Sequence, residues 1–212
     1  MMNKEQLLLY AVTDNTWTGK YTLQEQIEQA LLGGVTLLQL REKNLSEEEY
    51  LTKAIEIKKI CERFCVPLII NDNVEVALKS GADGVHVGTG DMAVHQIRKR
   101  AGENFIIGAT AKTVEQALTA QAEGADYLGV GAVFPSPTKK NAIRITKEQL
   151  LEITGSVEIP CVAIGGITLE NAEEIRDSGI CGIAVVSAVF GAQDIRAACR
   201  ELKEIVQKEV LS

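Results

Sequence analysis

Aromatic residues are scarce in this chain, which has one Trp, four Phe and four Tyr among its 212 residues. The core must therefore be mainly aliphatic, as it is in the layered interiors of parallel barrels. The five cysteines are odd in number and include no C-x-x-C pair. We therefore expect neither a disulfide framework nor a zinc site, but the buried, reduced thiols of a cytoplasmic protein.

An excess of positive charge is also lacking, because the formal net charge is -7 at pH 7. This balance argues against nucleic acid or an anionic membrane as a main partner. No apolar run approaches the roughly 20 residues that a membrane-spanning helix needs, and no N-terminal signal pattern is found. A local group of cations, together with a metal, could still bind a phosphorylated small molecule within an acidic protein.

No linker or low-complexity stretch divides the chain, so we expect residues 1–212 to form a single domain. Short apolar runs alternate with amphipathic helical patterns instead. The apolar runs cover residues 7–13, 36–40, 67–70, 84–87, 105–108, 127–132, 160–165 and 182–187. The helical patterns cover residues 22–33, 46–64, 73–80, 92–101, 113–123, 146–154, 169–178 and 192–209.

Eight strand–helix units in this rhythm predict a (β/α)8 TIM barrel of the α/β class. An open, doubly wound sheet is the alternative, but it usually has fewer strands, and no G-x-G-x-x-G follows the first apolar run. Local signals agree with the predicted helices. Ser46 with Glu49, and Thr113 with Gln116, fit capping boxes. Glycines at 33, 34, 81, 124 and 179 follow helical patterns, as helix terminators do.

Polar side chains gather where the predicted strands end, which is where barrels of this type carry their functional groups. Gln39, Arg41 and Lys43 alternate along one strand, so they share one face and would converge on an anion at the barrel mouth. The alternative is a solvated loop with a surface ion pair to Glu42.

Two carboxylates follow neighbouring strands. Asn71 and Asp72 end one apolar run, and Asp91 follows the next. Either Asp alone could be only a helix N-cap. Together, Asp72 and Asp91 predict a Mg²⁺ site, because Mg²⁺ is commonly held by one or two carboxylates plus substrate phosphates.

The other candidates give weaker signals. His86 lies inside an apolar strand, where a core histidine is at least as common as a catalytic one. Thr110 is a hydroxyl at a strand end, and His95 and Lys112 are expected on the surface.

Phosphate is expected at two places. The turn at Gly165-Gly166 follows the seventh predicted strand, and Val186-Ser187-Ala188 ends the eighth; such barrels bind phosphate after these two strands through backbone N–H groups. The loop after the sixth strand adds the hydroxyls of Ser136 and Thr138 and the ammonium of Lys139. With Arg41, Lys43 and a metal nearby, one monophosphate and one diphosphate substrate would each have a place.

Taken in order, these motifs resemble the thiamine-phosphate synthase (thiamine-phosphate pyrophosphorylase) family over almost the whole chain. The matching segments are Tyr10-Ala-Val-Thr-Asp14, Leu38-Gln-Leu-Arg-Glu-Lys43, Leu68-Ile-Ile-Asn-Asp72, Asp83-Gly-Val-His-Val-Gly88, Gly129-Val-Gly-Ala-Val-Phe-Pro-Ser-Pro-Thr-Lys139, Ala163-Ile-Gly-Gly-Ile167 and Val186-Ser-Ala188. The resemblance implies a cytoplasmic transferase of thiamine biosynthesis. It would join a hydroxymethylpyrimidine diphosphate to a thiazole phosphate, giving thiamine phosphate and pyrophosphate.

The resemblance also implies roles for residues. The pyrimidine diphosphate would be held by Gln39, Arg41, Lys43, Asn71 and Lys139, and Mg²⁺ by Asp72 and Asp91. Thr110, where the family usually has Ser, would contact the pyrimidine. The thiazole phosphate would be bound by Ser136, Thr138, Gly166, Val186 and Ser187. Arg41, Lys43 and Lys139 would act in catalysis by neutralising the charge of departing pyrophosphate during a dissociative reaction.

Besides Thr110, three positions depart from the family pattern. Thr89 stands in a segment that often reads G-Q-x-D, Lys112 stands where His is frequent, and Ser136 stands where Thr is frequent.

Other interpretations stay open. A thiazole tautomerase, a sugar-phosphate epimerase or aldolase, or a binding protein could use the same barrel, but a tautomerase would not need the carboxylate pair or Lys43 and Lys139. The sequence is compatible with a homo-oligomer and does not fix the oligomeric state. It also leaves open whether the thiazole is carboxylated.

Overall fold

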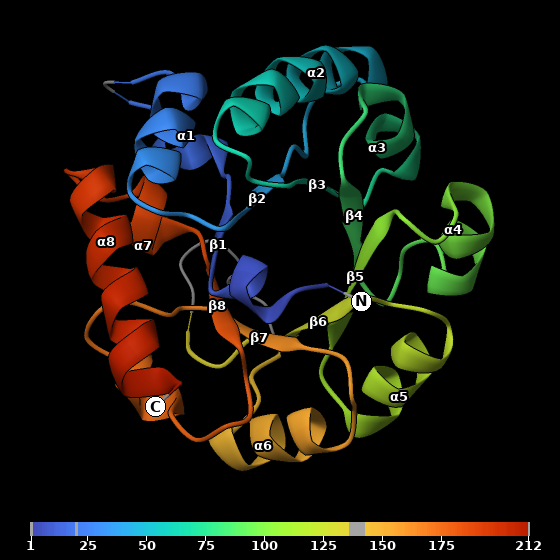
Figure 1. Cartoon of the computed structure of the whole chain (residues 1–212), viewed down its shortest axis with the longest axis vertical. Helices are drawn as coiled ribbons and strands as arrows, with labels where there is room; N and C mark the ends of the chain where they lie inside the picture. Colours follow the sequence, from blue (N-terminus) through green and yellow to red (C-terminus); the bar gives the residue numbers. More distant parts are fainter. Residues whose placement is uncertain (1, 20, 136–142, 212) are drawn as a thin grey trace.

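Eight parallel strands close into a barrel, with helices around its outside (Figure 1). This computed structural model describes residues 2–19, 21–135 and 143–211. The strands pair in chain order, and β1 closes the barrel against β8, with Tyr10 opposite Ala184. The (β/α)8 barrel predicted from the sequence is confirmed. The strands are β1 Leu9–Val12, β2 Leu37–Leu40, β3 Leu68–Asn71, β4 Gly84–Val87, β5 Ile106–Ala111, β6 Tyr127–Gly131, β7 Cys161–Ile164 and β8 Gly182–Val185.

The outer helices follow the predicted patterns closely. They are α1 Leu23–Leu32, α2 Glu47–Arg63, α3 Val74–Ser80, α4 Val94–Ala101, α5 Val114–Ala122, α6 Lys147–Gly155 and α8 Ile195–Ile205, which continues as the π-helix η4 Val206–Val210. The capping box of Ser46 with Glu49 is present. At α5 only half of the predicted box forms, because Thr113 caps the helix while the Gln116 side chain accepts from the backbone N–H of Lys112.

Short helical turns occupy four further places, namely η1 Lys4–Leu7, η2 Asn15–Trp17, η3 Ala172–Ile175 and α7 Ser187–Phe190. The helix predicted over 169–178 is therefore wrong, since only the single turn η3 forms there. Asn171 explains the loss, because its side chain accepts from the N–H of Thr168 and donates to the carbonyl of Gly166, which holds the segment in a turn. The prediction that Ser187 ends the eighth strand is also wrong, since β8 stops at Val185.

Two apolar layers hold the barrel. Alternate strand residues such as Leu9 and Ala11 pack outward against the helices, whereas Tyr10 and Val12 point into the barrel with Tyr127, Ile69 and others. The interior is thus less aliphatic than the composition suggests, since Tyr10 and Tyr127 meet there edge to face, with ring centroids 5.8 Å apart. The turn η1 lies over the barrel centre in Figure 1, and its Leu7 belongs to this inner layer.

Burial of the cysteines follows the prediction at three of the five positions, and Cys181 is only partly buried. All five are free thiols, and Cys61, Cys161 and Cys199 are buried. Cys65 is exposed, because it lies in the turn that follows α2, with a left-handed φ of 54°.

Candidate active site

A cavity of about 470 Å³ opens at the carboxyl ends of the strands. Every predicted site residue that the structure describes lines it, namely Gln39, Arg41, Lys43, Asn71, Asp72, Asp91, Thr110, Gly166, Val186 and Ser187. The remaining three, Ser136, Thr138 and Lys139, lie outside the described residues. The structure therefore brings together side chains that are far apart in the sequence.

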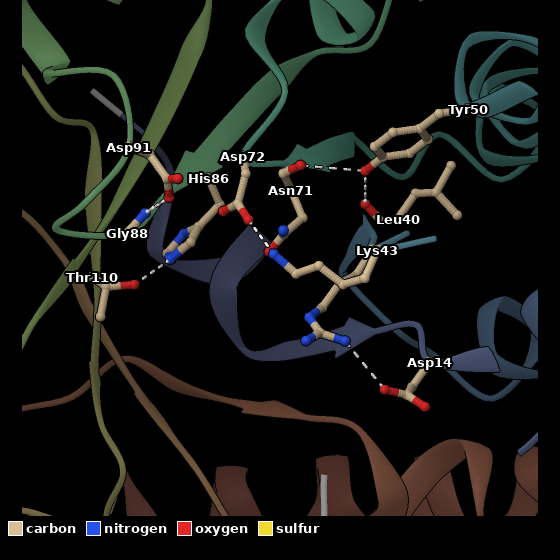
Figure 2. A network of polar contacts seen from close by, with 11 residues as sticks. Asp14, Leu40, Lys43, Tyr50, Asn71, Asp72, His86, Gly88, Asp91 and Thr110 are labelled. Atoms are coloured by element: carbon tan, nitrogen blue, oxygen red, sulfur yellow. Dashed lines mark hydrogen bonds and ion pairs between the residues drawn. The ribbon is translucent and has the colours of Figure 1, made fainter. Parts of the chain in front are cut away.

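The cations of the β2 loop are oriented by carboxylates. Arg41 donates to Asp14 at 3.2 Å, and Lys43 donates to Asp72 at 2.5 Å (Figure 2). The alternative interpretation, a surface ion pair with Glu42, is wrong, because Glu42 is buried and pairs with Lys53 at 2.7 Å. In the sequence Asp14 stands out only as the last residue of the family-like segment Tyr10-Ala-Val-Thr-Asp14, and its contact with Arg41 is visible only in the structure.

Asn71 presents an amide without a well-formed hydrogen bond. Its Nδ2 atom is buried and forms no hydrogen bond of good geometry among the described residues, although the Asn71 side chain lies close enough to Asp72 to help lower the pKa of that carboxyl. The Asn71 backbone is held by Tyr50, whose hydroxyl lies 2.7 Å from the carbonyl of Leu40 and 3.3 Å from that of Asn71 (Figure 2). Asn71 lines the cavity, and a buried donor without a well-formed hydrogen bond is costly unless a neighbour or a ligand accepts from it. Asn71 is therefore suited to an acceptor such as a phosphate oxygen.

Neither Asp72 nor Asp91 caps a helix, so that alternative is wrong for both. Asn73 is the N-cap of α3, and α4 begins after Ala93 without a side-chain cap. Asp72 adopts a left-handed φ of 61°, and its N–H donates to the carbonyl of His86 at 2.9 Å. Asp91 accepts from the N–H of Gly88 at 2.7 Å (Figure 2).

The two carboxylates influence one another, because their side chains are within hydrogen-bonding reach. Burial opposes ionisation of Asp72, but the hydrogen bond and charge of Lys43 outweigh it, so the pKa of Asp72 lies below its usual value. Desolvation raises the pKa of Asp91, the Gly88 N–H opposes this, and the negative charge of Asp72 adds to the rise. One lysine does not fully neutralise this pair, so the site favours a further cation.

The donor set fits a hard divalent ion. Two carboxylates supply oxygen ligands of the kind that Mg²⁺ prefers. Within the described parts of the chain, no group of three or more His, Cys, Asp or Glu side chains is placed to hold a metal. An ion bound between Asp72 and Asp91 would therefore need additional oxygen ligands from water or from a phosphorylated substrate.

His86 lies in the cavity floor and is a satisfied core histidine. Its Nδ1 is 3.1 Å from the Tyr127 hydroxyl, and its Nε2 is 3.0 Å from Oγ1 of Thr110. Burial lowers the pKa of His86 to about 4, so the ring is neutral near pH 7. The Tyr127 hydroxyl in turn is 2.8 Å from that of Tyr10, which accepts a short hydrogen bond from Gln39. Sequence reasoning missed both tyrosines.

The turn after β7 is shaped for close approach to a ligand. Gly165 and Gly166 have φ of 106° and 66°, a region that glycine adopts readily. A side chain at Gly166 would overlap the carbonyl oxygen of Pro135, so the loop after β6 begins against this turn. The N–H of Phe134 donates to the carbonyl of Gly165 at 2.9 Å. Asn171, which sequence reasoning missed, supports the turn through Gly166.

Two surface expectations have different outcomes. His95 is on the surface, where it pairs with Glu123 at 3.0 Å. Lys112 is not a simple surface residue, because it lines the cavity beyond Thr110, as does Thr89. In the described parts of the chain, no helix is long and apolar enough to span a membrane.

Comparisons with known proteins agree along the whole barrel. A family model described as thiamine monophosphate synthase matches residues 9–189. A thiamine-phosphate synthase of Ruminiclostridium cellulolyticum is 47% identical over 205 residues, which are 97% of this chain and 98% of that protein. A thiamine-phosphate synthase of Methanobrevibacter smithii is 46% identical over 201 residues, 95% of this chain and 96% of that protein.

A solved structure is similar as well. The thiamine phosphate pyrophosphorylase from Pyrococcus furiosus aligns with a TM-score of 0.89 and 41% identity, covering 99% of both chains. The matches in sequence and in barrel structure together carry the assignment, and the chain belongs to the thiamine monophosphate synthase family.

Proposed function

We propose that this protein condenses 4-amino-2-methyl-5-hydroxymethylpyrimidine diphosphate with 4-methyl-5-(2-hydroxyethyl)thiazole phosphate, or its carboxylated form, giving thiamine phosphate and pyrophosphate. The observation that carries the proposal is the carboxylate pair Asp72 and Asp91, which borders the same cavity as Arg41 and Lys43. This combination suits a diphosphate leaving group. The relatives carry the synthase name, which favours the transferase over the thiazole tautomerase.

The leaving group is the part of the reaction that the charged side chains address. Asp72 and Asp91 would hold Mg²⁺, and when bound this ion supplies positive charge to the departing pyrophosphate. Arg41 and Lys43 add charge from the β2 loop, and the Asn71 amide donates to a phosphate oxygen. Lys139, outside the described residues, is proposed to act beside them. No protein nucleophile is needed, since the pyrimidine itself can stabilise a carbocation.

The acceptor must reach the same carbon from the other side of the cavity. We place the thiazole phosphate at the turn of Gly166 and at Val186 and Ser187, which border the cavity across from the carboxylates in strand order. Ser136 and Thr138 are proposed to contribute hydroxyls. Holding both substrates in one cavity converts a bimolecular reaction into a local one, which is a large part of the expected rate enhancement.

Three further statements remain predictions from the sequence. They are a single domain over residues 1–212, a cytoplasmic location, and a homo-oligomer as a compatible state.

The test is pyrophosphate release by purified protein given both substrates, with and without Mg²⁺. We expect release only when both substrates and the ion are present. Asp72→Asn should reduce kcat/KM at least about 100-fold, because a carboxylate ligand and the partner of Lys43 are lost together.

Asp177→Asn is a matched control, since Asp177 also has a left-handed φ, of 60°, but lies on the surface beside Arg176. It should keep wild-type activity. Absence of release from folded wild-type protein would contradict the proposal.

A further inference from the structure

We propose that Gln39, Tyr10, Tyr127, His86 and Thr110 form a hydrogen-bond relay whose direction makes one end a donor and the other an acceptor toward the substrate. Tyr10, Tyr127 and His86 would then be positioning residues that select the polar pattern of the pyrimidine. The inference rests on the proposed function and goes beyond it, because it assigns a role to Tyr10, Tyr127 and His86, which carry none of the charge of the site, and Tyr127 does not line the cavity at all.

The contacts are continuous across the barrel. Gln39 on β2 reaches the hydroxyl of Tyr10 on β1, and that hydroxyl lies 2.8 Å from the hydroxyl of Tyr127 on β6. His86 on β4 continues the chain, 3.1 Å from Tyr127 and 3.0 Å from Thr110 on β5. Gln39, Tyr10, Tyr127 and His86 are all less than 9% exposed, so water does not substitute for these partners.

Two glycines make room for the rings. A side chain at Gly108 would overlap the Tyr127 ring, and a Cβ at Gly129 would lie 3.0 Å from Cε1 of His86. Gly108 on β5 and Gly129 on β6 therefore provide the space that the Tyr127 and His86 rings occupy.

The number of protons available for hydrogen bonding determines the direction of the bonds along the relay. Each phenol and a neutral imidazole carry one proton for hydrogen bonding, and each of the three interior groups has one neighbour on either side. All links are satisfied only when every interior group accepts from one neighbour and donates to the other. The relay therefore runs in one of two directions, and a break in direction leaves a buried group unpaired.

The ends are consequently linked. If the Gln39 amide N–H donates to Tyr10, its carbonyl is left as an acceptor for the cavity, and Thr110, which accepts from His86, is left with a hydroxyl proton to donate. In the opposite direction Gln39 offers N–H to the cavity and Thr110 offers a lone pair. An aminopyrimidine carries an amine donor and ring-nitrogen acceptors, so it can pair with both ends of the relay, one of which donates while the other accepts. A ring that carries only acceptors does not.

The test compares two ligands by calorimetric binding with Mg²⁺ and without thiazole phosphate. They are the 4-amino pyrimidine diphosphate and its 4-methoxy analogue, which has acceptors only. Equilibrium binding avoids the separate effect of the amine on the rate of bond cleavage. We expect wild type to prefer the amino ligand by about tenfold or more in Kd, since one mismatched polar group in a buried site costs that much.

Tyr127→Phe and Tyr10→Phe leave the rings in place, and both remove the hydrogen bond between the two phenols; the first also removes the link to His86 and the second the link to Gln39. In either variant the hydrogen-bond orientations of Gln39 and Thr110 are no longer coupled. The preference in Kd for the amino ligand should therefore fall to about threefold or less. Tyr50→Phe is the matched control, because it also removes a buried phenol hydroxyl but lies outside the relay. It should keep the wild-type preference.

A second readout follows the imidazole directly. The chain has two histidines, so His95→Gln leaves His86 as the only one in a ¹⁵N spectrum. The amino ligand should drive His86 to a single tautomer, and Tyr127→Phe should abolish this response.

The outcomes separate the two proposals. An equal ligand preference in wild type and both relay variants, or an equal loss in Tyr50→Phe, would overturn the relay while pyrophosphate release still supports the synthase. Wild-type protein that releases no pyrophosphate would overturn the synthase first.

Discussion

Single side chains in this site are constrained by burial as much as by partners. His86 is the clearest example, because it is enclosed by Tyr127 and Thr110 and its pKa is lowered to about 4. Its ordinary value in an unfolded chain is about 6.5. Between pH 6.5 and pH 4 the histidine is protonated in the unfolded state but mostly neutral in the folded state. The free energy of unfolding should therefore fall as the pH falls through this range.

The expected loss from His86 is roughly 2 kcal/mol at pH 5 and roughly 3 kcal/mol near pH 4, compared with pH 7.5. Urea unfolding at these pH values measures it. In His86→Gln the pH-dependent loss should shrink by this amount, whereas the surface variant His95→Gln should keep it. An unchanged pH dependence in His86→Gln would contradict a buried neutral ring.

Asn171 supports the proposed phosphate turn through two hydrogen bonds, at 2.8 Å from Thr168 and 2.9 Å to Gly166. Asn171→Ala removes both, so the turn after β7 should lose its fixed shape. We expect KM for the thiazole phosphate to rise about tenfold, with a much smaller change for the pyrimidine diphosphate. Asn3→Ala, which removes a cap at η1 on the opposite side of the barrel, should change neither KM. Equal rises for both substrates would argue against a local role.

At the scale of elements, close packing between neighbouring strands determines which residues are tolerated. Gly108 on β5 faces the Tyr127 ring on β6, and a methyl group there would overlap that ring. Gly108→Ala should therefore lower the free energy of unfolding by about 1 to 3 kcal/mol, the usual cost of overpacking. Chemical denaturation measures it. Gly155→Ala, at an open position of α6, should be neutral or stabilising.

The sequence predicted elements well where periodicity was strong and failed where side chains redirected the backbone. Every strand and seven of the eight helices were anticipated, because apolar runs and caps are local signals. The helix over 169–178 failed because the Asn171 side chain competes for backbone hydrogen bonds, which hydrophobic periodicity does not register.

Within the site, too, some residues could be predicted from the sequence and others could not. Asp72 and Arg41 were found because polar residues at strand ends stand out in the sequence. The contact between Tyr10 and Tyr127 joins residues 117 positions apart inside apolar strands, where a tyrosine looks like any other core residue. The direction of Lys112 into the cavity depends on the exact end of β5, which sequence patterns locate only to within a few residues.

For the whole molecule, the cavity is expected to be completed by its ligands. Two carboxylates alone offer Mg²⁺ few of the oxygen ligands it prefers, and pyrophosphate alone adds negative charge beside Asp72 and Asp91. Mg²⁺ and pyrophosphate together should therefore raise Tm by several degrees, whereas either alone should raise it little.

Thermal unfolding with each ligand and with both measures this coupling. Asp91→Asn should remove the joint effect without lowering Tm in the absence of ligands, because it relieves repulsion within the carboxylate pair. Equal stabilisation by pyrophosphate with and without the ion would contradict a shared site.

The pairing of β1 with β8 has a consequence for co-translational folding of the protein. Tyr10, near the start of the chain, has no neighbour on one side until Ala184 has been synthesised and has left the exit tunnel. Asp72 and Asp91 are synthesised well before Ala184, whereas Ser187 is synthesised after it, and β1 can pair with β8 only once β8 has emerged. Catalytic competence should therefore arrive in one late step of biosynthesis, and a nascent chain released too early would carry the charged half of the site without the half that receives the acceptor.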